Sequence, residues 1–328
     1  MRDARPAVEG SGGCGFPPTP RAGNVAAVSN PVTPLSLGAD QRGLVCHADN
    51  LQLLPRIADD TVDLIYIDPP FNTGRVQRRT QLRTVRDEEG DRIGFGGHRY
   101  RTERLSEQAY SDSFADYEAF LAPRLEHAHR ILSPSGSLYV HLDYREVHYV
   151  KVLLDAIFGR DNFLNEIIWA YDYGGRPRDR WPAKHDTILL YAKQAGRHIF
   201  DRDAVDRIPY MAPSLVGEEK AARGKLPTDT WWHTIVSPTG KEKLGYPTQK
   251  PLGIVRRALL ASSAPGSLVC DFFAGSGTLG AAALLEGRRF LLVDSHAAAI
   301  DVMRKRFATA SGVSFLAQDA RASESASS

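Results

Sequence analysis

The sequence predicts an α/β fold with a doubly wound, mostly parallel sheet, helices on both faces and one inserted region. Short aliphatic and β-branched runs alternate along the chain with segments of helical periodicity, which is typical of βαβ units. The run at 62–67 is almost continuously apolar, as strands buried on both faces are. Two runs lead directly into distinctive loops, at 68–74 and 271–278. Ligands of open α/β sheets bind beyond such strand ends, so these loops are the expected site.

The first half of the chain begins with an expected strand at 44–47, a short helix at 51–57 and the strand at 62–67. A long polar stretch from 75 to about 108 follows. Apolar residues at helical spacing predict a helix over 114–132, which the Ser-Pro-Ser-Gly sequence at 133–136 ends. Pro123 inside this pattern predicts a kink or a break. Then come a strand at 137–142, a helix at 147–158 and strands at 166–171 and 186–191.

The region from 197 to 244 interrupts this alternation with prolines, mixed charge and a pair of tryptophans, and is expected to be an inserted subdomain or large loop. Order returns with a helix at 252–262, a strand at 268–272, a helix after Gly277, a strand at 290–294 and a helix to Phe307. Residues 1–40, rich in Pro, Gly, Ser and Ala, and residues 318–328, small and polar, are expected to be disordered tails. The ordered chain is thus divided into 41–196, 197–244 and 245–317.

Composition excludes several classes of protein. The 328 residues carry a formal net charge of only +2, so bulk charge does not indicate a nucleic-acid binder. No apolar run approaches the length of a membrane span and no secretory signal is recognisable, so we expect a cytoplasmic location and no membrane partner. The three cysteines have no paired spacing and predict neither a disulfide framework nor a metal site.

The first loop, Asp68-Pro69-Pro70-Phe71, has the residue types that activate an amino group on an aromatic ring. The lone pair of such a nitrogen is delocalised into the ring. The carboxylate of Asp68 and the carbonyl of Pro69 can accept its two hydrogens and free the lone pair for attack on a methyl sulfonium. The two prolines hold that carbonyl rigidly, and Phe71 offers a flat face to an extruded base. A Pro-Pro turn that merely closes a strand is the alternative that this loop alone leaves open.

The second loop runs from Asp271 to Thr278, with Gly275 and Gly277 in its turn. Glycines there permit a tight turn and close approach of a ligand to the backbone. Asp294, at the end of the next strand, occupies the position that binds ribose hydroxyls in nucleotide-binding folds. A dinucleotide site is disfavoured because the third glycine of that motif is not at its spacing. A carboxylate beside the turn also suits an ammonium group better than a pyrophosphate.

Together the two loops resemble those of the amino-methyltransferases of DNA. The catalytic loop precedes the cofactor loop, an order similar to the permuted β class and to the modification subunits of restriction systems. Further matches are the sequences at 48–50, 114–136, 246–251 and 287–290, so that the resemblance covers roughly residues 43 to 308. Two positions depart from the commonest pattern, Phe272 in place of proline and Phe71 in place of tyrosine, and neither change suggests an inactive enzyme.

The resemblance implies a Rossmann-like methyltransferase that uses S-adenosyl-L-methionine, with 41–196 as its catalytic half, 197–244 as a target-recognition insertion and 245–317 as its cofactor-binding half. The implied catalytic residues are Asp68, Pro69, Pro70 and Phe71. The implied cofactor-binding residues are Asp49, Asp68, Thr248, Lys250, Asp271, Phe273, Ala274, Gly275, Ser276, Gly277, Thr278 and Asp294. For Asp49 a helix N-cap, and for Lys250 a solvated lysine at a helix start, remain alternatives.

The implied partner is double-stranded DNA. The residues assigned to DNA contact are Arg75, Arg78, Arg79, Arg176, Arg178, Trp231 and Trp232. The arginines follow the catalytic loop or lie in a glycine-containing loop after a strand, where they suit phosphate contacts, with solvated loops as the alternative. The two tryptophans suit stacking or wedging between bases, although the core of a small subdomain is the favoured interpretation of such a pair.

The aspartate form of the catalytic loop goes mostly with adenine N6 in this family, so adenine is the predicted target base and cytosine N4 is the alternative. A methyltransferase of RNA or of protein glutamine is a remoter alternative. So is a non-catalytic DNA-binding partner that kept the fold. A restriction endonuclease partner and a homodimer are left open.

Overall fold

The computed structural model describes residues 34–73, 75–86, 92–93, 99–112, 114, 116–237 and 240–317, with the backbone alone between 75 and 112. Most of the expected N-terminal tail and all of the expected tail at 318–328 lie outside these residues. Among the described residues, no helix combines the length and the hydropathy of a membrane span.

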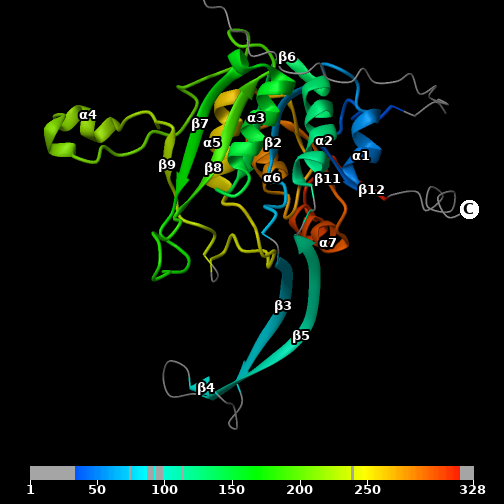
Figure 1. Cartoon of the computed structure of the whole chain (residues 1–328), viewed down its shortest axis with the longest axis vertical. Helices are drawn as coiled ribbons and strands as arrows, with labels where there is room; N and C mark the ends of the chain where they lie inside the picture. Colours follow the sequence, from blue (N-terminus) through cyan, green and yellow to red (C-terminus); the bar gives the residue numbers. More distant parts are fainter. Residues whose placement is uncertain are drawn as a thin grey trace, which may run out of the picture. The chain divides into compact units, whose positions relative to one another are not determined.

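A nine-stranded sheet forms the centre of the fold, in the order β12-β1-β11-β10-β2-β6-β8-β7-β9 (Figure 1). All neighbouring strands of this sheet are parallel, except that β8 is antiparallel to both β6 and β7. The prediction of a mostly parallel sheet is therefore confirmed. The strands are β1 (Gly43–His47), β2 (Val62–Ile67), β6 (Leu132–Leu142), β7 (Phe163–Ala170), β8 (His185–Ala192), β9 (Thr230–Trp232), β10 (Leu268–Asp271), β11 (Arg289–Asp294) and β12 (Val313–Ala317).

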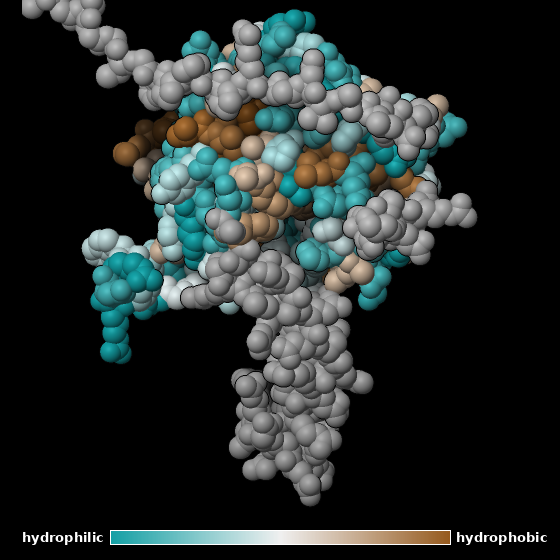
Figure 2. Space-filling view, turned by 45° about the vertical axis from the view of Figure 1, so that its right-hand side comes forward, coloured by the Kyte–Doolittle hydropathy of each residue, from teal (hydrophilic) through white to brown (hydrophobic). Residues whose placement is uncertain are grey.

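Helices cover both faces of this sheet. One hydrophobic core contains buried residues of α1 (Asn50–Leu53), α2 (Tyr117–Ile131) and α3 (Val147–Phe158). The other contains those of α5 (Leu252–Ser262), α6 (Thr278–Leu285) and α7 (Ala297–Arg306). Successive side chains of β2 enter opposite cores, which explains why its sequence is continuously apolar. On the side of the molecule that Figure 2 shows, hydrophobic residues of the described chain form a band between hydrophilic surfaces.

Helix α2 continues through Pro123, so the predicted alternative of a break at this residue is wrong. The Asp116 side chain caps its start by accepting a hydrogen bond of 2.8 Å from the backbone N–H of Ala119. Leu121 and Leu125, on either side of the proline, are fully buried. The packing of this apolar face outweighs the one backbone hydrogen bond that proline cannot donate.

The polar stretch after β2 is a strand pair, which the sequence did not predict. Its backbone forms the long antiparallel strands β3 (Arg75–Arg86) and β5 (Arg99–Asp112), with β4 (Arg92–Ile93) paired to β5, in a separate three-stranded sheet (Figure 1). The alternation of apolar and polar residues that marks a half-buried strand is absent here, so periodicity could not reveal it. β3 begins immediately after the first loop, and β5 ends shortly before α2 begins.

The interrupting region 197–244 has little regular structure. It contains a 3-10 turn (Pro213–Leu215), the short helix α4 (Glu218–Arg223) and β9, which pairs with β7 and so extends the main sheet. Val205 in this region packs with Leu260 and Ala261 of α5 in a small separate cluster.

Strands β2 and β10 are neighbours in the sheet although they come from opposite halves of the sequence. From β2 the chain passes through α2 to β6 on one side, and from β10 it passes through α6 to β11 on the other. The crossovers thus diverge between β2 and β10, which makes this position a topological switch point. The two predicted loops follow these two strands and therefore meet.

Candidate active site

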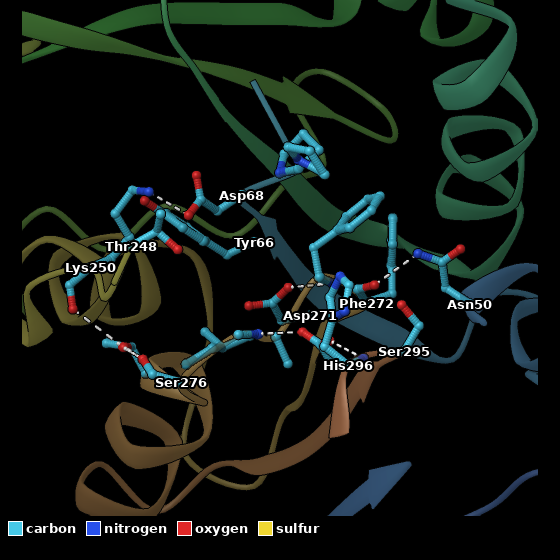
Figure 3. Close-up of a pocket in the computed structure, with 18 of the residues that line it drawn as sticks. Asn50, Tyr66, Asp68, Thr248, Lys250, Asp271, Phe272, Ser276, Ser295 and His296 are labelled. Carbon is cyan, nitrogen blue, oxygen red and sulfur yellow. Dashed lines mark hydrogen bonds and ion pairs between the residues drawn. The ribbon is translucent and has the colours of Figure 1, made fainter. Parts of the chain in front are cut away.

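A cavity of about 280 Å³ lies where β2 and β10 end (Figure 3). The fold brings to it all four predicted catalytic residues, Asp68, Pro69, Pro70 and Phe71. The predicted cofactor-binding residues that line it are Asp49, Asp68, Thr248, Lys250, Asp271, Phe273, Ala274, Gly275, Ser276, Thr278 and Asp294. Gly277 alone among the predicted site residues of the two loops is not part of the lining.

Asp68 follows β2 directly, and its two carboxylate oxygens have different surroundings. Oδ2 forms an ion pair with the ammonium group of Lys250. Oδ1 is buried and has no hydrogen-bond partner among the residues that the structure describes. A buried carboxylate oxygen without a donor is costly, so this atom is an acceptor site for a donor on a bound molecule.

The loop that carries Asp68 is held in place by contacts beyond it. The hydroxyl of Tyr117 donates to the carbonyl of Pro70 at 2.7 Å. Asn72 has a left-handed backbone (φ 50°), which asparagine tolerates better than most residues. Its side-chain amide donates to Glu146 at 2.8 Å and accepts from the N–H of Phe114 at 2.9 Å. The loop is therefore tied at both ends to the segments that start α2 and α3.

Lys250 is buried between the two loops. Only 12% of its side chain is exposed, so the alternative of a solvated lysine is wrong. Its ammonium nitrogen lies 5.0 Å from the ring centre of Phe71, and its carbonyl accepts from the Thr278 hydroxyl at 3.3 Å. One residue earlier, the buried Gln249 accepts from the N–H of Leu244 at 2.9 Å and so fixes this segment.

The glycine loop is closed by the carboxylate of Asp294. This group accepts hydrogen bonds from the N–H of Gly275 at 2.7 Å and of His296 at 2.8 Å. Gly275 and Gly277 both have left-handed backbones, with φ of 49° and 74°. A Cβ on Gly275 would lie 3.1 Å from Tyr246 in the pocket wall, whereas one on Gly277 would lie 2.8 Å from Met303 in the core. Gly277 thus permits helix packing rather than ligand approach.

The floor of the cavity is acidic. Burial raises the pKa of Asp271 well above its usual range; the hydrogen bond from Phe273 N–H opposes this, and the charges of Asp68 and Asp294 add to it. Burial also raises the pKa of Asp294. Carboxylates held at a cost in this way favour a cationic ligand group, whose charge would lower their pKa again.

Asp271→Asn is expected to stabilise the ligand-free protein at neutral pH. The folded pKa of Asp271 is raised, so its contribution is most favourable below about pH 4 and is lost as the pH rises. Asparagine keeps the oxygen that accepts from Phe273 at 2.9 Å but cannot ionise. Urea unfolding without ligand should show a gain on the order of 1 kcal/mol at about pH 7.5 and a smaller difference at about pH 4.5. A wild type that is the more stable protein at the higher pH contradicts this.

Asn50 and Arg124 belong to the pocket but were missed in the sequence. Arg124 of α2 donates from Nε to Asn50 at 2.7 Å, and Asn50 donates to the carbonyl of Phe272 at 2.9 Å. Arg124 is only 7% exposed although it lies in a helix interior, and an arginine on an apolar helix face was the signal that could have revealed it. The neighbouring Asp49 caps α1 through Leu51 N–H at 2.9 Å while it also lines the pocket.

Among the residues assigned to DNA contact, those whose side chains are described (Arg176, Arg178, Trp231 and Trp232) do not line the cavity. Arg75, Arg78 and Arg79 belong to β3, where the described structure is backbone only. Arg176 and Arg178 are exposed in the loop between β7 and β8.

The two tryptophans differ. The side chain of Trp231 is buried, and its indole N–H donates to the carbonyl of Thr228 at 2.8 Å, so it belongs to the core and offers no face to a base. Trp232 is 73% exposed and is the last residue of β9, so it lies at the end of the sheet where Asp68 follows β2. The interpretation as a core pair therefore applies to Trp231 alone.

Fold and site together define a doubly wound α/β protein with a ligand cavity at its switch point and a carboxylate acceptor beside it. The chain belongs to the DNA methylase family of N6/N4 methyltransferases, whose model matches residues 62–305. It is therefore a DNA methyltransferase of the amino-group class.

Individual relatives agree with this assignment. The chain is 27% identical over 291 residues to the DNA adenine methyltransferase YhdJ of Escherichia coli (strain K12), covering 85% of this chain and 86% of that one. It is 28% identical over 268 residues to the type II methyltransferase M.HpaI of Haemophilus parainfluenzae, covering 81% and 74%. Its fold is similar to that of the cytosine-N4-specific PvuII DNA methyltransferase (TM-score 0.55, 16% identity, covering 87% and 89%). It is also similar to that of the M1.HpyAVI–SAM complex (TM-score 0.51, 19% identity, covering 81% and 98%).

Proposed function

We propose that this enzyme transfers a methyl group from S-adenosyl-L-methionine to the N6 amino group of an adenine flipped out of double-stranded DNA. The observation that carries the proposal is the unpartnered, buried Oδ1 of Asp68 beside the ring of Phe71. An amino group supplies the donor that this oxygen lacks, and an aromatic base supplies a partner for the ring.

The residues of the first loop would act on the target nitrogen by accepting its hydrogens. Asp68 Oδ1 takes one hydrogen and the carbonyl of Pro69 takes the other, which frees the nitrogen lone pair from the ring. The hydroxyl of Tyr117 already occupies the next carbonyl, that of Pro70, and so fixes the direction of the loop. Lys250 holds the second oxygen of Asp68, which keeps the carboxylate oriented for this task.

The second loop fits S-adenosyl-L-methionine by charge. The buried carboxylate of Asp271 suits the methionine ammonium, and Asp294 lies where ribose hydroxyls bind in nucleotide folds. Thr248 and Lys250 are the residues proposed for the carboxylate side of the methionine, and Asp49 for the adenine side. When bound, this molecule supplies an activated methyl group on its sulfonium.

Adenine is preferred because position 68 is aspartate, the form of the loop that accompanies adenine N6 in this family; YhdJ, one of the relatives, is an adenine methyltransferase. Cytosine N4 is the second candidate, since both bases offer an exocyclic amino group to the same acceptors.

The test is transfer of tritiated methyl from S-adenosyl-L-methionine to unmethylated DNA, with RNA and protein as parallel substrates. We expect label in DNA alone, and N6-methyladenine after digestion to nucleosides. Label in RNA or protein but none in DNA overturns the proposal. Recovery of N4-methylcytosine instead of N6-methyladenine would show that cytosine is the target base.

The DNA-contacting surface is proposed to lie at the same edge of the sheet as the cavity. β7 and β2 both run parallel to β6, so the loop after β7 emerges at the edge where Asp68 lies. This loop carries Arg176 and Arg178, and it also carries Trp181, which is 95% exposed. Exposed arginines bind phosphates, and exposed indoles stack on bases.

Replacement of both Arg176 and Arg178 by alanine is expected to weaken DNA binding about tenfold. It should also make the slope of log affinity against log salt concentration shallower by about two. Fluorescence anisotropy with labelled DNA over a range of salt concentrations measures both effects. Arg160→Ala is the matched control, because this exposed arginine precedes β7 and so lies at the opposite edge. An equal loss of affinity in the control, or an unchanged salt slope in the double variant, refutes this assignment.

We further propose that residues 197–244 contribute to recognition of the target sequence and that the enzyme works where DNA is found, in the cytoplasm. M.HpaI is a type II methyltransferase, which supports a restriction endonuclease as a partner here. A homodimer is the second association proposed, and sedimentation with and without DNA tests it.

A further inference from the structure

Four polar side chains near the catalytic loop form a hydrogen-bonded network that has no part in the steps described above; Tyr66 and His141 are buried, and Asp186 and Tyr171 are half-buried. The hydroxyl of Tyr66 lies 3.1 Å from Nδ1 of His141, and Nε2 of His141 lies 3.1 Å from Oδ2 of Asp186. The other oxygen of Asp186 accepts from the hydroxyl of Tyr171 at 2.9 Å. These residues come from or directly follow the four adjacent strands β2, β6, β8 and β7.

The network touches the site at two points. Tyr66 lines the cavity two residues before Asp68, and its ring is drawn among the pocket residues in Figure 3. The ring of His141, which is fully buried, lies 5.9 Å from the ring of Phe71. Trp169 packs edge-on against the other side of His141 at 5.4 Å. The imidazole therefore has no room to turn, and it forms part of the support beneath Phe71.

In this hydrogen-bonded network, each group has a fixed role as donor or acceptor. Burial raises the pKa of Asp186, but the hydrogen bonds from His141 and Tyr171 and the charge of Lys250 outweigh it, so the net shift is downward. Asp186 is thus ionised and only accepts. The Nε2 atom of His141 must then carry a hydrogen, and the bond that one ring nitrogen makes sets the state of the other. Among the described residues Nδ1 is the hydrogen-bond partner of the Tyr66 hydroxyl, so this hydroxyl satisfies its own hydrogen by donating to Nδ1.

We propose that His141, oriented by Asp186, is a positioning residue for methyl transfer: it fixes the hydroxyl of Tyr66 as a donor toward the protein and supports Phe71 from below. Because the Tyr66 hydroxyl donates to His141, its oxygen is left as an acceptor. The Tyr66 side of the pocket wall then offers an acceptor near Asp68, whose other oxygen is bound by Lys250, and this suits an amino group. This inference rests on the proposed function, since it concerns the same base and the same loop.

A purely structural role predicts something different. A fully satisfied buried network also specifies packing, and its disruption lowers stability without regard to hydrogen-bond direction. The two roles separate in a variant that keeps every heavy-atom contact and reverses the direction alone.

Asp186→Asn is that variant. Tyr171 still donates to the amide oxygen, which leaves the amide nitrogen facing Nε2 of His141 as a donor. Nε2 must then accept, Nδ1 must carry the hydrogen, and Tyr66 becomes the acceptor and turns its own hydrogen away. We expect single-turnover methyl transfer to DNA to fall about 10- to 100-fold, with affinity for S-adenosyl-L-methionine within about threefold of wild type.

Tyr66→Phe completes the test, because it removes the hydroxyl and little else. Alone it should slow transfer about tenfold, and in the Asp186→Asn background it should add little, since the reversed hydroxyl no longer contributes. Tyr139→Phe is the matched control. Tyr139 stacks on Tyr66 at 6.1 Å and donates or accepts in a buried pair with Ser262 at 2.8 Å, outside the cavity lining. Its loss should lower the urea midpoint and leave the transfer rate unchanged.

Two results overturn the inference. One is a wild-type transfer rate in both Asp186→Asn and Tyr66→Phe. The other is independent, multiplicative losses in the double variant. If Asp186→Asn does not fold, Tyr66→Phe against Tyr139→Phe decides alone, and equal rates in these two refute it. All rates are compared with an active wild type, so absence of transfer by the wild type itself is failure of the proposed function and is seen first.

Discussion

Asp68→Asn is expected to reduce single-turnover methyl transfer to DNA by about 10³-fold or more. The buried Oδ1 of Asp68 is an acceptor without a partner, while Oδ2 is bound to Lys250. An asparagine that keeps its oxygen toward Lys250 must direct its NH₂ group at the target nitrogen. A donor then meets a donor, and the lone pair of that nitrogen stays in the ring.

The affinity for S-adenosyl-L-methionine should change by no more than a few fold in this variant, because the ammonium partner Asp271 and the loop at Gly275 are untouched. Rapid quenching measures the rate, and calorimetry measures the affinity. Asp63→Asn is the control on the same strand: Asp63 accepts from Leu268 N–H at 3.0 Å, away from the cavity. A loss of affinity as large as the loss of rate would show that Asp68 serves cofactor binding instead.

Gly277→Val is expected to destabilise the protein by more than about 3 kcal/mol and, through this, to abolish cofactor binding. Two costs add at this position. The backbone has φ of 74°, where a β-branched residue is strained, and a Cβ would lie 2.8 Å from Met303 and 3.2 Å from Phe307. The substitution separates α6 from α7, and the glycine loop is the start of α6.

Gly287→Val separates the two costs. Gly287 has φ of 71°, but nothing lies within 4 Å of the Cβ that it would acquire. Its variant carries the backbone strain without the clash and should lose only about 1–2 kcal/mol. Urea unfolding of both variants measures the difference. If both variants lose the same free energy of unfolding, the clash with Met303 and Phe307 does not contribute, and the effect of Gly277→Val is backbone strain alone.

The sequence predicted the elements whose residue pattern is set by burial, on both faces of β2 and on one face of each helix. The bounds of β2, α3 and α5 coincide with their predicted ranges, and Asp68 and Asp271 line one cavity because each follows a buried parallel strand. The long strands β3 and β5 were missed because their sequences do not alternate between apolar and polar residues. Strand β12, at the edge of the sheet, was also missed.

Other parts of the site depend on partners that no local pattern reveals. Arg124 contacts Asn50 across a separation of 74 residues, and Tyr66 contacts His141 across 75. In the sequence, each of these residues could equally be an ordinary member of a helix or strand with no role in the site. Only the fold decides which polar groups meet, so the loops were predictable and the network beneath them was not.

The pairing of β2 with β10 also determines when the enzyme becomes active during synthesis. Leu64 pairs with Val269, so closure of the site requires the formation of a contact between residues far apart in the chain, which is slow. A ribosome-bound chain presents its catalytic loop long before Asp271 has left the exit tunnel. The site is therefore incomplete until the segment that carries β10 and Asp271 has emerged and paired with β2.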